Sequence, residues 1–246
     1  ITTDHECFTL EEALEKLSLG MQVQIREGSA ARNLDDLMPL LNGHSRNCML
    51  CSDDKHPDDL AEGHINEMVK RSINAGIDPL KVLWSASVTP VKTYGLKVGL
   101  LQKGDAADFI IVDALESFRV QKTFIDGQCV SEHSKSKLSS VPNEPLNQFE
   151  AEAQAPENFR IKAKTSSVPV IEVIDGQLVT HKYEWNPTLD GDGFIQTDLE
   201  NDILKIAVLN RYSLSRPAIA LIKNFGLKEG AIASSVAHDS HNIVAV

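Results

Sequence analysis

The sequence predicts an α/β fold followed by smaller modules that contain β-structure. Over residues 1–88, short apolar strand-like segments alternate with helical segments, an order typical of a parallel sheet with crossover helices. Residues 89–131 turn to short apolar segments punctuated by glycine, which indicates a small β-module. Residues 132–157 are polar and contain several prolines, as expected of an exposed linker, and residues 158–246 predict an additional α+β domain.

Composition and charge limit the classes of partner. The chain has 246 residues, of which 42% are apolar and 24% charged, and this is ordinary for a globular protein with a sizeable core. The net charge of -11 would repel nucleic acids and anionic membranes. No apolar run approaches the roughly 20 residues that cross a bilayer, and the N-terminus lacks a basic region followed by an apolar stretch. We therefore expect a cytoplasmic protein without nucleic-acid or membrane partners. Its charge does not argue against a small neutral ligand.

The first region predicts strands separated by helices. Thr9 and Glu12 match the capping box of a helix that runs towards Gly20. Pro79 follows Asp78 at a first-turn position where helices tolerate proline. The segments MQVQI (21–25) and CML (48–50) are predicted strands, and the predicted helices cover residues 9–20, 33–41, 58–74 and a segment that starts at 78.

The two later regions predict short strands joined by tight turns. The second region contains TPVKTYGL, GLLQKGDAADFIIVD and FRVQKTFIDGQCV, with Asp126-Gly127 as a hairpin turn. In the third region, Asp175-Gly176 is a second hairpin signal. The acidic loop LDGDGF (189–194) lacks the ligand pattern of an EF-hand and is interpreted as a solvated turn. The last residues, NIVAV, predict a strand cut off within a domain, so we expect a fragment.

The four cysteines do not predict a metal site. Cys48 and Cys51 form a C-x-x-C inside an apolar segment, whereas Cys7 and Cys129 stand alone. A zinc finger needs a second ligand pair at matched spacing. We therefore expect buried thiols that bind no metal.

Polar residues with catalytic chemistry gather after the predicted strands of the first region. His5, Glu27 and Asp53 each follow a strand, and the carboxyl ends of parallel strands open onto the binding crevice of α/β proteins. Imidazole and carboxylate groups are ligands of hydrolytic divalent metals. A single histidine beside acids is more often structural or solvated, and the adjacent Asp4 and Glu6 are weaker candidates.

One segment resembles the part of amidohydrolases that returns from the catalytic barrel to a β-sandwich. Thr89–Asp113 reads TPVKTYGLKVGLLQKGDAADFIIVD and matches that pattern closely, with Val91 where alanine is usual. The phrases similar to adenine deaminases of this superfamily are IREGSAARNL (25–34), SDDKHP (52–57), EGHINEMVKRSINAGIDP (62–79) and SVAHDSHNIVAV (235–246). The resemblance covers nearly the whole chain. It implies the C-terminal part of a metal-dependent (β/α)8 barrel over 1–88, a β-sandwich segment over 89–131 and an additional C-terminal domain.

The resemblance also implies roles for four residues. His5 matches a histidine that binds the metal after barrel strand six, and Asp53 matches the aspartate after strand eight that touches the metal and shuttles the proton. Glu27 becomes a candidate substrate contact, as does Asp54, for which a solvated or supporting role is as good an interpretation. The implied reaction is hydrolytic deamination of adenine to hypoxanthine and ammonia. Its cofactor would be a divalent metal, with manganese or iron favoured over zinc.

The chain lacks parts that the resemblance requires. No H-x-H occurs upstream of His5, whereas the family carries such a pair on the first barrel strand and further ligands after strands four and five. Roughly three of eight strand-helix units cannot close a barrel. We therefore expect the isolated chain to be inactive, and the enzyme to be a homo-oligomer or to associate with the N-terminal half that is missing here.

Two alternatives to adenine deamination remain open. One is another amidohydrolase that acts on a cyclic amide, and the other is a catalytically inactive scaffold. Near the end of the chain, His238, Asp239 and His241 have the spacing of a local metal site. A pair of histidines three residues apart needs further ligands, so a structural or substrate-pocket role is favoured for them.

Overall fold

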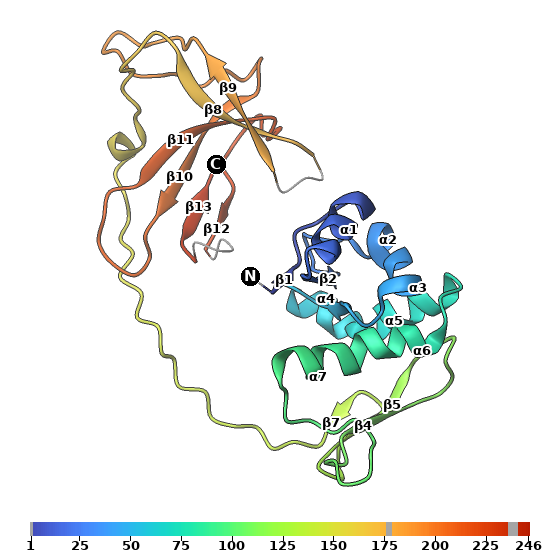
Figure 1. Cartoon of the computed structure of the whole chain (residues 1–246). Coiled ribbons are helices and arrows are strands. Elements are labelled where there is room, and N and C mark those ends of the chain that lie inside the picture. Colours follow the sequence, from blue (N-terminus) through green and yellow to red (C-terminus); the bar gives the residue numbers. More distant parts are fainter. Residues whose placement is uncertain (1, 176–178, 236–240) are drawn as a thin grey trace. The chain divides into compact units, whose positions relative to one another are not determined.

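The computed structural model describes residues 2–175, 179–235 and 241–246 (Figure 1). The chain divides into two compact units, residues 1–141 and 142–246. Among the described residues, the first unit contains a three-stranded and a four-stranded sheet, and the second contains a six-stranded sheet. The domain boundaries expected at residues 88, 131 and 157 stay predictions.

Strands and helices alternate at the start of the first unit. The elements are β1 (Thr3–Asp4), α1 (Leu10–Ser18), β2 (Gln22–Arg26), α2 (Leu34–Leu37), the 3-10 helix η1 (Met38–Leu40), α3 (Leu41–His44), β3 (Cys48–Cys51), α4 (Pro57–Glu62), α5 (Ile65–Asn74), α6 (Pro79–Leu83), the π-helix η2 (Trp84–Val88) and α7 (Thr89–Tyr94). The strands pair in parallel in the order β1-β2-β3. The predicted parallel sheet with helices in its crossovers is confirmed.

The expected cap of α1 forms with one change. The hydroxyl of Thr9 accepts a hydrogen bond from the N–H of Glu12 at 3.3 Å. The Glu12 carboxylate accepts in return from the N–H of Phe8 at 3.3 Å, rather than from Thr9 as in the standard capping box. Gly20, with φ 83°, follows the end of the helix, where glycine adopts this conformation without steric cost.

Two of the predicted helices are interrupted. The helix expected over 58–74 is wrong as one element, because the backbone at Gly63 is extended (φ 171°, ψ 166°) and separates α4 from α5. A side chain at Gly63 would overlap that of Glu67. The helix expected over 33–41 is split into α2, η1 and α3, and Pro39, which cannot donate a backbone hydrogen bond, lies in η1.

The largest correction concerns residues 89–95, which we predicted to begin the β-module. They form α7 instead, which continues α6 through a π-helical turn and ends at Gly95 in the left-handed conformation (φ 60°). Pro90 does not stop the helix, because the preceding π-turn has already left the regular i to i−4 ladder. The hydroxyls of Ser85 and Thr89 both donate to the carbonyl of Ser45, which anchors this helix next to β3.

The β-module is an antiparallel sheet of four strands in the order β4-β5-β6-β7. Its strands are β4 (Phe109–Val112), β5 (Val120–Ile125), β6 (Gln128–Glu132) and β7 (Lys135–Ser136). Asp126 and Gly127 both have positive φ, 49° and 75°, so the predicted hairpin turn is confirmed. Residues 99–108, expected as part of a strand, are irregular because the Asp108 carboxylate accepts from the N–H groups of Gly99 and Asp126 and holds the loop against the hairpin.

One apolar core joins the elements of the first unit. Val23 and Ile25 from β2 and Cys48 from β3 are fully buried, and Leu37 and Val69 cover them from α2 and α5. Burial of one such valine, leucine or isoleucine side chain contributes roughly 1.5–3 kcal/mol to the free energy of unfolding. Along β2 the buried Val23 and Ile25 alternate with the half-buried Gln22 and Gln24, and the buried Arg26 ends the strand.

The cysteines in and beside this core have raised thiol pKa values. Burial raises the pKa of the Cys48 thiol to about 12 and that of the Cys7 thiol to about 11, the latter with help from the Asp4 carboxylate. Burial also raises the pKa of Cys51 to about 11. These thiols are therefore protonated at neutral pH. Cys7 and Cys48 are buried as expected, whereas Cys51 and Cys129 are half-buried.

The segment between the four-stranded sheet and the six-stranded sheet is extended and exposed. Residues 137–155 have no regular secondary structure, as predicted for the middle of the linker, whereas Lys135 and Ser136 still pair with β6. From residue 142 onward the segment is part of the second unit. There the N–H of Glu150 donates to the carbonyl of Arg211, and the Arg211 guanidinium lies 4.2 Å from the centre of the Phe149 ring.

The second unit is built from strands. They are β8 (Val168–Val173), β9 (Thr180–Trp185), β10 (Ile203–Leu209), β11 (Ala218–Lys223), β12 (Ala233–Ser234) and β13 (Ile243–Ala245), after a 3-10 helix, η3 (Pro156–Phe159). Their order is β12-β13-β10-β11-β8-β9. The α+β expectation is corrected here, since no α-helix occurs in the part of residues 158–246 that the structure describes. Of the predicted turn at Asp175-Gly176, Gly176 lies outside the described residues, while β8 and β9 on either side pair antiparallel.

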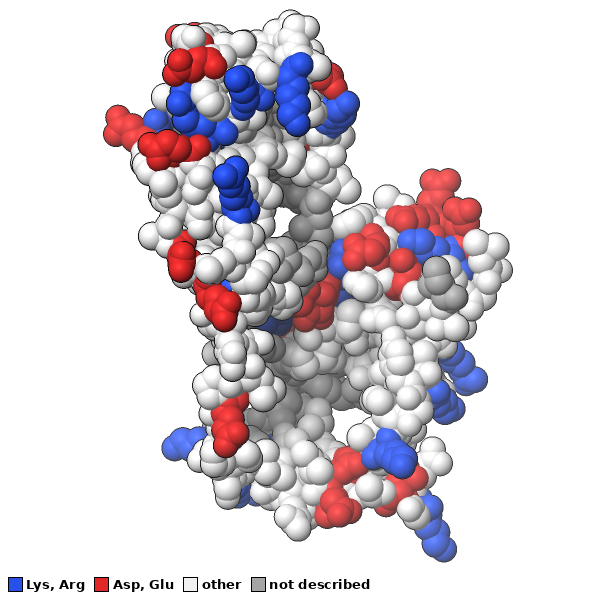
Figure 2. All heavy atoms as spheres, turned by 90° about the vertical axis from the view of Figure 1, so that its left-hand side faces the viewer, with Lys and Arg blue, Asp and Glu red and all other residues white. Residues whose placement is uncertain are grey.

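Charged side chains of both signs are interspersed over the face drawn in Figure 2. The acidic loop at 189–194 is a turn, as predicted, in which the Asp190 carboxylate accepts from the N–H groups of Asp192 and Phe194 and from Arg160. Such exposed pairs contribute little to stability.

Among the described residues, no helix combines the length and apolarity that crossing a membrane requires.

Two glycines of the first unit allow a test of this packing. A Cβ at Gly99 would overlap the backbone carbonyl of Ala106, which cannot rotate away, whereas a Cβ at Gly43, within α3, would meet nothing within 4 Å. Gly99→Ala should destabilise the protein by about 1–3 kcal/mol. Gly43→Ala should stabilise it by about 0.5–1 kcal/mol. Thermal unfolding of both variants measures this, and an unchanged midpoint for Gly99→Ala would contradict the close approach of the two backbones.

Candidate active site

A buried arginine lies at the carboxyl ends of the three parallel strands. Arg26 is the last residue of β2 and is 3% exposed. Its backbone is fixed by Asn33, whose side-chain oxygen accepts from the N–H of Arg26 at 2.8 Å and whose amide donates to the carbonyl of Cys7 at 2.9 Å. A buried guanidinium requires acids nearby, because removal of a charge from water is costly.

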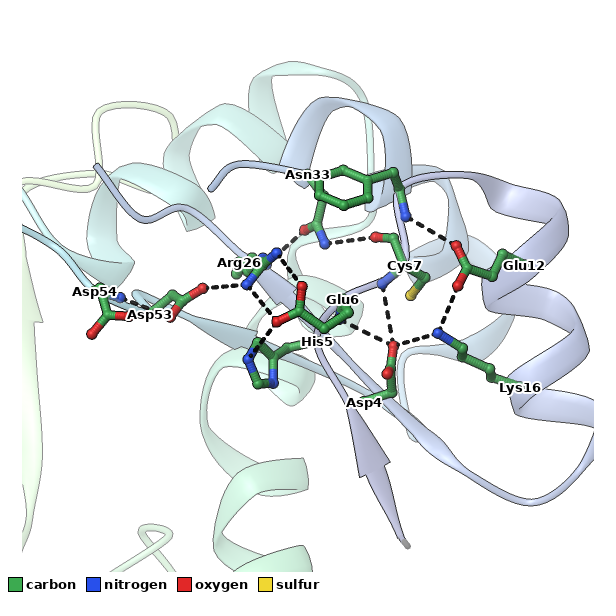
Figure 3. A network of polar contacts seen from close by, with 11 residues as sticks. Asp4, His5, Glu6, Cys7, Glu12, Lys16, Arg26, Asn33, Asp53 and Asp54 are labelled. Carbon is green, nitrogen blue, oxygen red and sulfur yellow. Dashed lines mark hydrogen bonds and ion pairs between the residues drawn. The ribbon is translucent and has the colours of Figure 1, made fainter. Parts of the chain in front are cut away.

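Two carboxylates from different loops meet this guanidinium (Figure 3). Glu6, after β1, accepts from Nη1 at 3.1 Å and from Nη2 at 2.8 Å. Asp53, after β3, accepts from Nη1 at 2.7 Å. The other side of Glu6 faces His5, whose Nε2 lies 3.1 Å from Glu6 Oε1. The network therefore joins His5 and Asp53, the two predicted metal ligands, through Glu6 and Arg26.

Asp53 is held in an unusual backbone conformation. Its φ is 52°, in the left-handed region that few residues other than glycine, asparagine and aspartate adopt. Its Oδ1 accepts from the N–H of Asp54 at 2.8 Å, while Arg26 occupies Oδ2. Residues of this kind persist where surrounding contacts over-determine them, and they cluster at functional sites.

The environment of Asp53 favours its ionised form. Burial acts to raise the pKa of this carboxyl, but the hydrogen bond and positive charge of Arg26 and the N–H of Asp54 outweigh burial and lower the pKa below 3.8. The reciprocal effect holds for Arg26, where burial opposes the charge and the carboxylates of Asp53 and Glu6 raise the pKa. Asp53 is therefore a carboxylate at neutral pH and can accept a proton.

The donor chemistry at these strand ends fits part of a divalent metal site. His5 offers an imidazole and Asp53 a carboxylate, both of which bind first-row metals. Metal-binding histidines typically donate their second ring N–H to a carboxylate, and Glu6 is in place to accept from His5. No group of three or more His, Cys, Asp or Glu side chains that could hold a metal occurs among the described residues.

Glu27 lies in a cleft beside this network. Its side chain is 13% exposed and accepts from Arg71 Nη1 at 2.6 Å, and the other nitrogen of Arg71 donates to Asp35 at 2.6 Å. The cleft has a volume of about 410 Å³ and is also lined by Lys55 and Glu67. Its size and its mixed donors and acceptors suit a small polar ligand.

The loop after β2 connects the cleft to Asp53. A Cβ at Gly28, which lines the cleft, would lie 3.4 Å from the Cβ of Asp53 and 3.4 Å from the carbonyl of Asp54. The N–H of Ser29 donates to that same Asp54 carbonyl at 3.1 Å. These are ordinary contacts, and the tightest neighbour of such a Cβ would be the carbonyl of Ala31 in the same loop, at 3.1 Å. The two loops are joined by the Ser29–Asp54 hydrogen bond, in which Asp54 takes part through its main chain.

The structure brings together more residues than the sequence predicted. His5 and Asp53 join one network and Glu27 lines the neighbouring cleft, whereas Arg26 and Arg71 were not predicted and Glu6 was a weaker candidate. The available signal was an arginine that ends the apolar strand MQVQIR, since arginine is almost never fully buried unless it is paired. Near the C-terminus, His238 and Asp239 lie outside the described residues, and His241 has a positive φ of 52°.

Comparison with characterised sequences gives two family matches and several relatives. The amidohydrolase family matches residues 2–130, and the adenine deaminase C-terminal domain matches residues 177–246. Among its relatives are the adenine deaminase of Salinibacter ruber, 50% identical over 100% of this chain and 45% of that protein, and that of a Sulfurovum species, 48% identical over 100% and 44%. The chain thus spans less than half the length of these relatives.

A solved structure was also matched. The β-aspartyl dipeptidase of Fervidobacterium islandicum aligns with 54% of this chain and 37% of that one, with a TM-score of 0.45 and 22% identity. The family assignment depends instead on the sequence match over residues 2–130, which covers more than half of the chain and contains the whole network around Arg26. The chain belongs to the amidohydrolase family.

Proposed function

We propose that the enzyme that carries this chain deaminates adenine hydrolytically to hypoxanthine and ammonia. The observation that carries the proposal is the network around the buried Arg26 that joins Asp53 to His5 at the carboxyl ends of β3 and β1. The adenine deaminases that match the whole chain, and the match of residues 177–246 to their C-terminal domain, support adenine as the substrate.

Asp53 would act as both base and acid in this reaction. As a carboxylate it would accept a proton from the attacking water while the water oxygen bonds to the purine carbon that bears the amino group. It would then return the proton to the amino nitrogen as the carbon–nitrogen bond breaks and ammonia leaves. His5 and Asp53 would hold a divalent metal, with manganese or iron favoured over zinc. When bound, the metal would supply a water of lowered pKa.

The cleft beside Asp53 would hold the purine. A purine presents both hydrogen-bond donors and acceptors at its edge, and Glu27 offers an acceptor while Arg71 offers donors. We propose Glu27 as a substrate contact, and Asp54 as a second one at the rim. The predicted order of modules, barrel to residue 88 and β-sandwich segment to residue 131, belongs to the same proposal.

The rest of the ligand set would come from outside this chain. Relatives are more than twice as long, and no group of three or more side chains that could hold a metal occurs in the part of the chain that the structure describes. We propose that an N-terminal half supplies the remaining histidines, that the isolated chain is inactive, and that the enzyme is cytoplasmic and forms a homo-oligomer or associates with that half.

Loss of the proposed base should abolish most turnover. In the metal-replete enzyme, Asp53→Asn should lower kcat for ammonia release from adenine by about 100-fold or more. Asp58→Asn, an exposed aspartate at the start of α4, is the matched control and should retain full activity. Chelation should also remove activity, and manganese should restore it in the wild type. Turnover of adenine by Asp53→Asn at the wild-type rate would disprove the assigned role.

The cleft carboxylate should act on binding more than on chemistry. Glu27→Gln should raise KM for adenine about tenfold, since a hydrogen bond to a charged group contributes about 1.5–3 kcal/mol. Asp35→Asn is the control, because Asp35 shares Arg71 with Glu27 but is 76% exposed outside the cleft. Equal effects of the two substitutions would show that Glu27 acts only by holding Arg71.

A further inference from the structure

We propose that Arg26 and Glu6 form a tether that positions the carboxylate of Asp53 relative to the loop that carries His5. The inference rests on the proposed function, in which Asp53 transfers the proton. Neither residue is assigned a contact with substrate, so both are positioning residues. Three observations support this role: the geometry of the fork, the closed ring behind it and the restraint on Asp53.

One nitrogen of the Arg26 guanidinium connects the loop after β1 to the loop after β3. Nη1 donates to Glu6 Oε1 at 3.1 Å and to Asp53 Oδ2 at 2.7 Å, and Nη2 donates to Glu6 Oε2 at 2.8 Å. Figure 3 shows the guanidinium between the two carboxylates. Because the guanidinium is planar and rigid, its two-point contact with Glu6 also fixes the direction in which Nη1 meets Asp53.

A closed ring of hydrogen bonds holds the fork from behind. Asn33, which is 1% exposed, accepts from the N–H of Arg26 at 2.8 Å and donates to the carbonyl of Cys7 at 2.9 Å. Cys7 directly follows Glu6, and the carboxylate of Glu6 returns to the guanidinium. The ring thus runs from the backbone of Arg26 to its own side chain, so a shift of Glu6 would be opposed at both ends.

The carboxylate of Asp53 is restrained at both oxygens. Oδ1 accepts from the N–H of Asp54 and Oδ2 from Arg26. Without the second contact the side chain could turn about its Cα–Cβ bond while the first contact weakens. Proton transfer is sensitive to such changes, because a misplacement of about 1 Å can cost about 100-fold in rate.

Glu6 is the member of the tether that can be altered safely. Its side chain is 59% exposed, whereas that of Arg26 is 4% exposed. Glu12 offers a matched control, since it is a glutamate of the same polar network with a 44% exposed side chain that pairs with Lys16 instead of Arg26. Glutamine at either position preserves size and removes the charge.

The test compares Glu6→Gln, Arg26→Lys and Glu12→Gln in the complete, manganese-loaded enzyme. Glu6→Gln should lower kcat for adenine by about tenfold or more while KM changes less than about twofold, the pattern of a lost transition-state interaction. Arg26→Lys keeps the charge but cannot form the fork, so it should show the same split. Glu12→Gln should match the wild type in both constants.

A crystal structure of Glu6→Gln provides a readout that does not depend on turnover. The tether predicts that the Asp53 carboxylate turns away from its wild-type position. If Asp53 stays in place, or if it moves and kcat is unchanged, the inference is overturned. If the wild-type enzyme does not deaminate adenine, the proposed function fails, and the movement of Asp53 alone then decides whether the tether exists.

Discussion

Burial of the Arg26 guanidinium at the ends of three parallel strands constrains the loops around it. A charge removed from water is stable only when acids meet it, and here the acids come from the loops after β1 and β3. Those loops must therefore converge on the end of β2. The positive φ of Asp53 is a consequence, because the contacts of its carboxylate compensate for a backbone conformation that costs roughly 1–2 kcal/mol.

The alternation of side chains along a β-strand then directs the adjacent residues Arg26 and Glu27 to different places. Successive side chains of a strand point to opposite sides, and Arg26 enters the buried network while Glu27 enters the cleft with Arg71. The loop that follows is joined to the loop after β3 by the hydrogen bond from the N–H of Ser29 to the carbonyl of Asp54. Two consecutive residues thus contact the proposed base and supply a carboxylate to the cleft.

Local patterns predicted the elements of this region better than their interruptions. A cap identified α1, apolar alternation identified β2 and a short apolar run identified β3, because each signal depends on neighbours in the sequence. The break at Gly63 was missed because an isolated glycine is tolerated inside helices. The helix α7 was missed because it contains Pro90, and a proline normally ends a helix. For the site, His5 and Asp53 could be proposed from their place after strands. The Arg26–Glu6 fork could not, because it joins residues 20 positions apart through a tertiary contact.

Formal charges around the strand ends would make the buried arginine compatible with the proposed metal. Glu6 and Asp53 share one guanidinium, which leaves one negative charge at neutral pH, and Lys16 balances Asp4 next to them. Residual negative charge favours a cation beside Asp53 and His5. Because arginine stays protonated at any physiological pH, it holds the two carboxylates together whether or not a metal is bound. The network can therefore preserve the arrangement of the proposed base before the rest of the ligand set is complete.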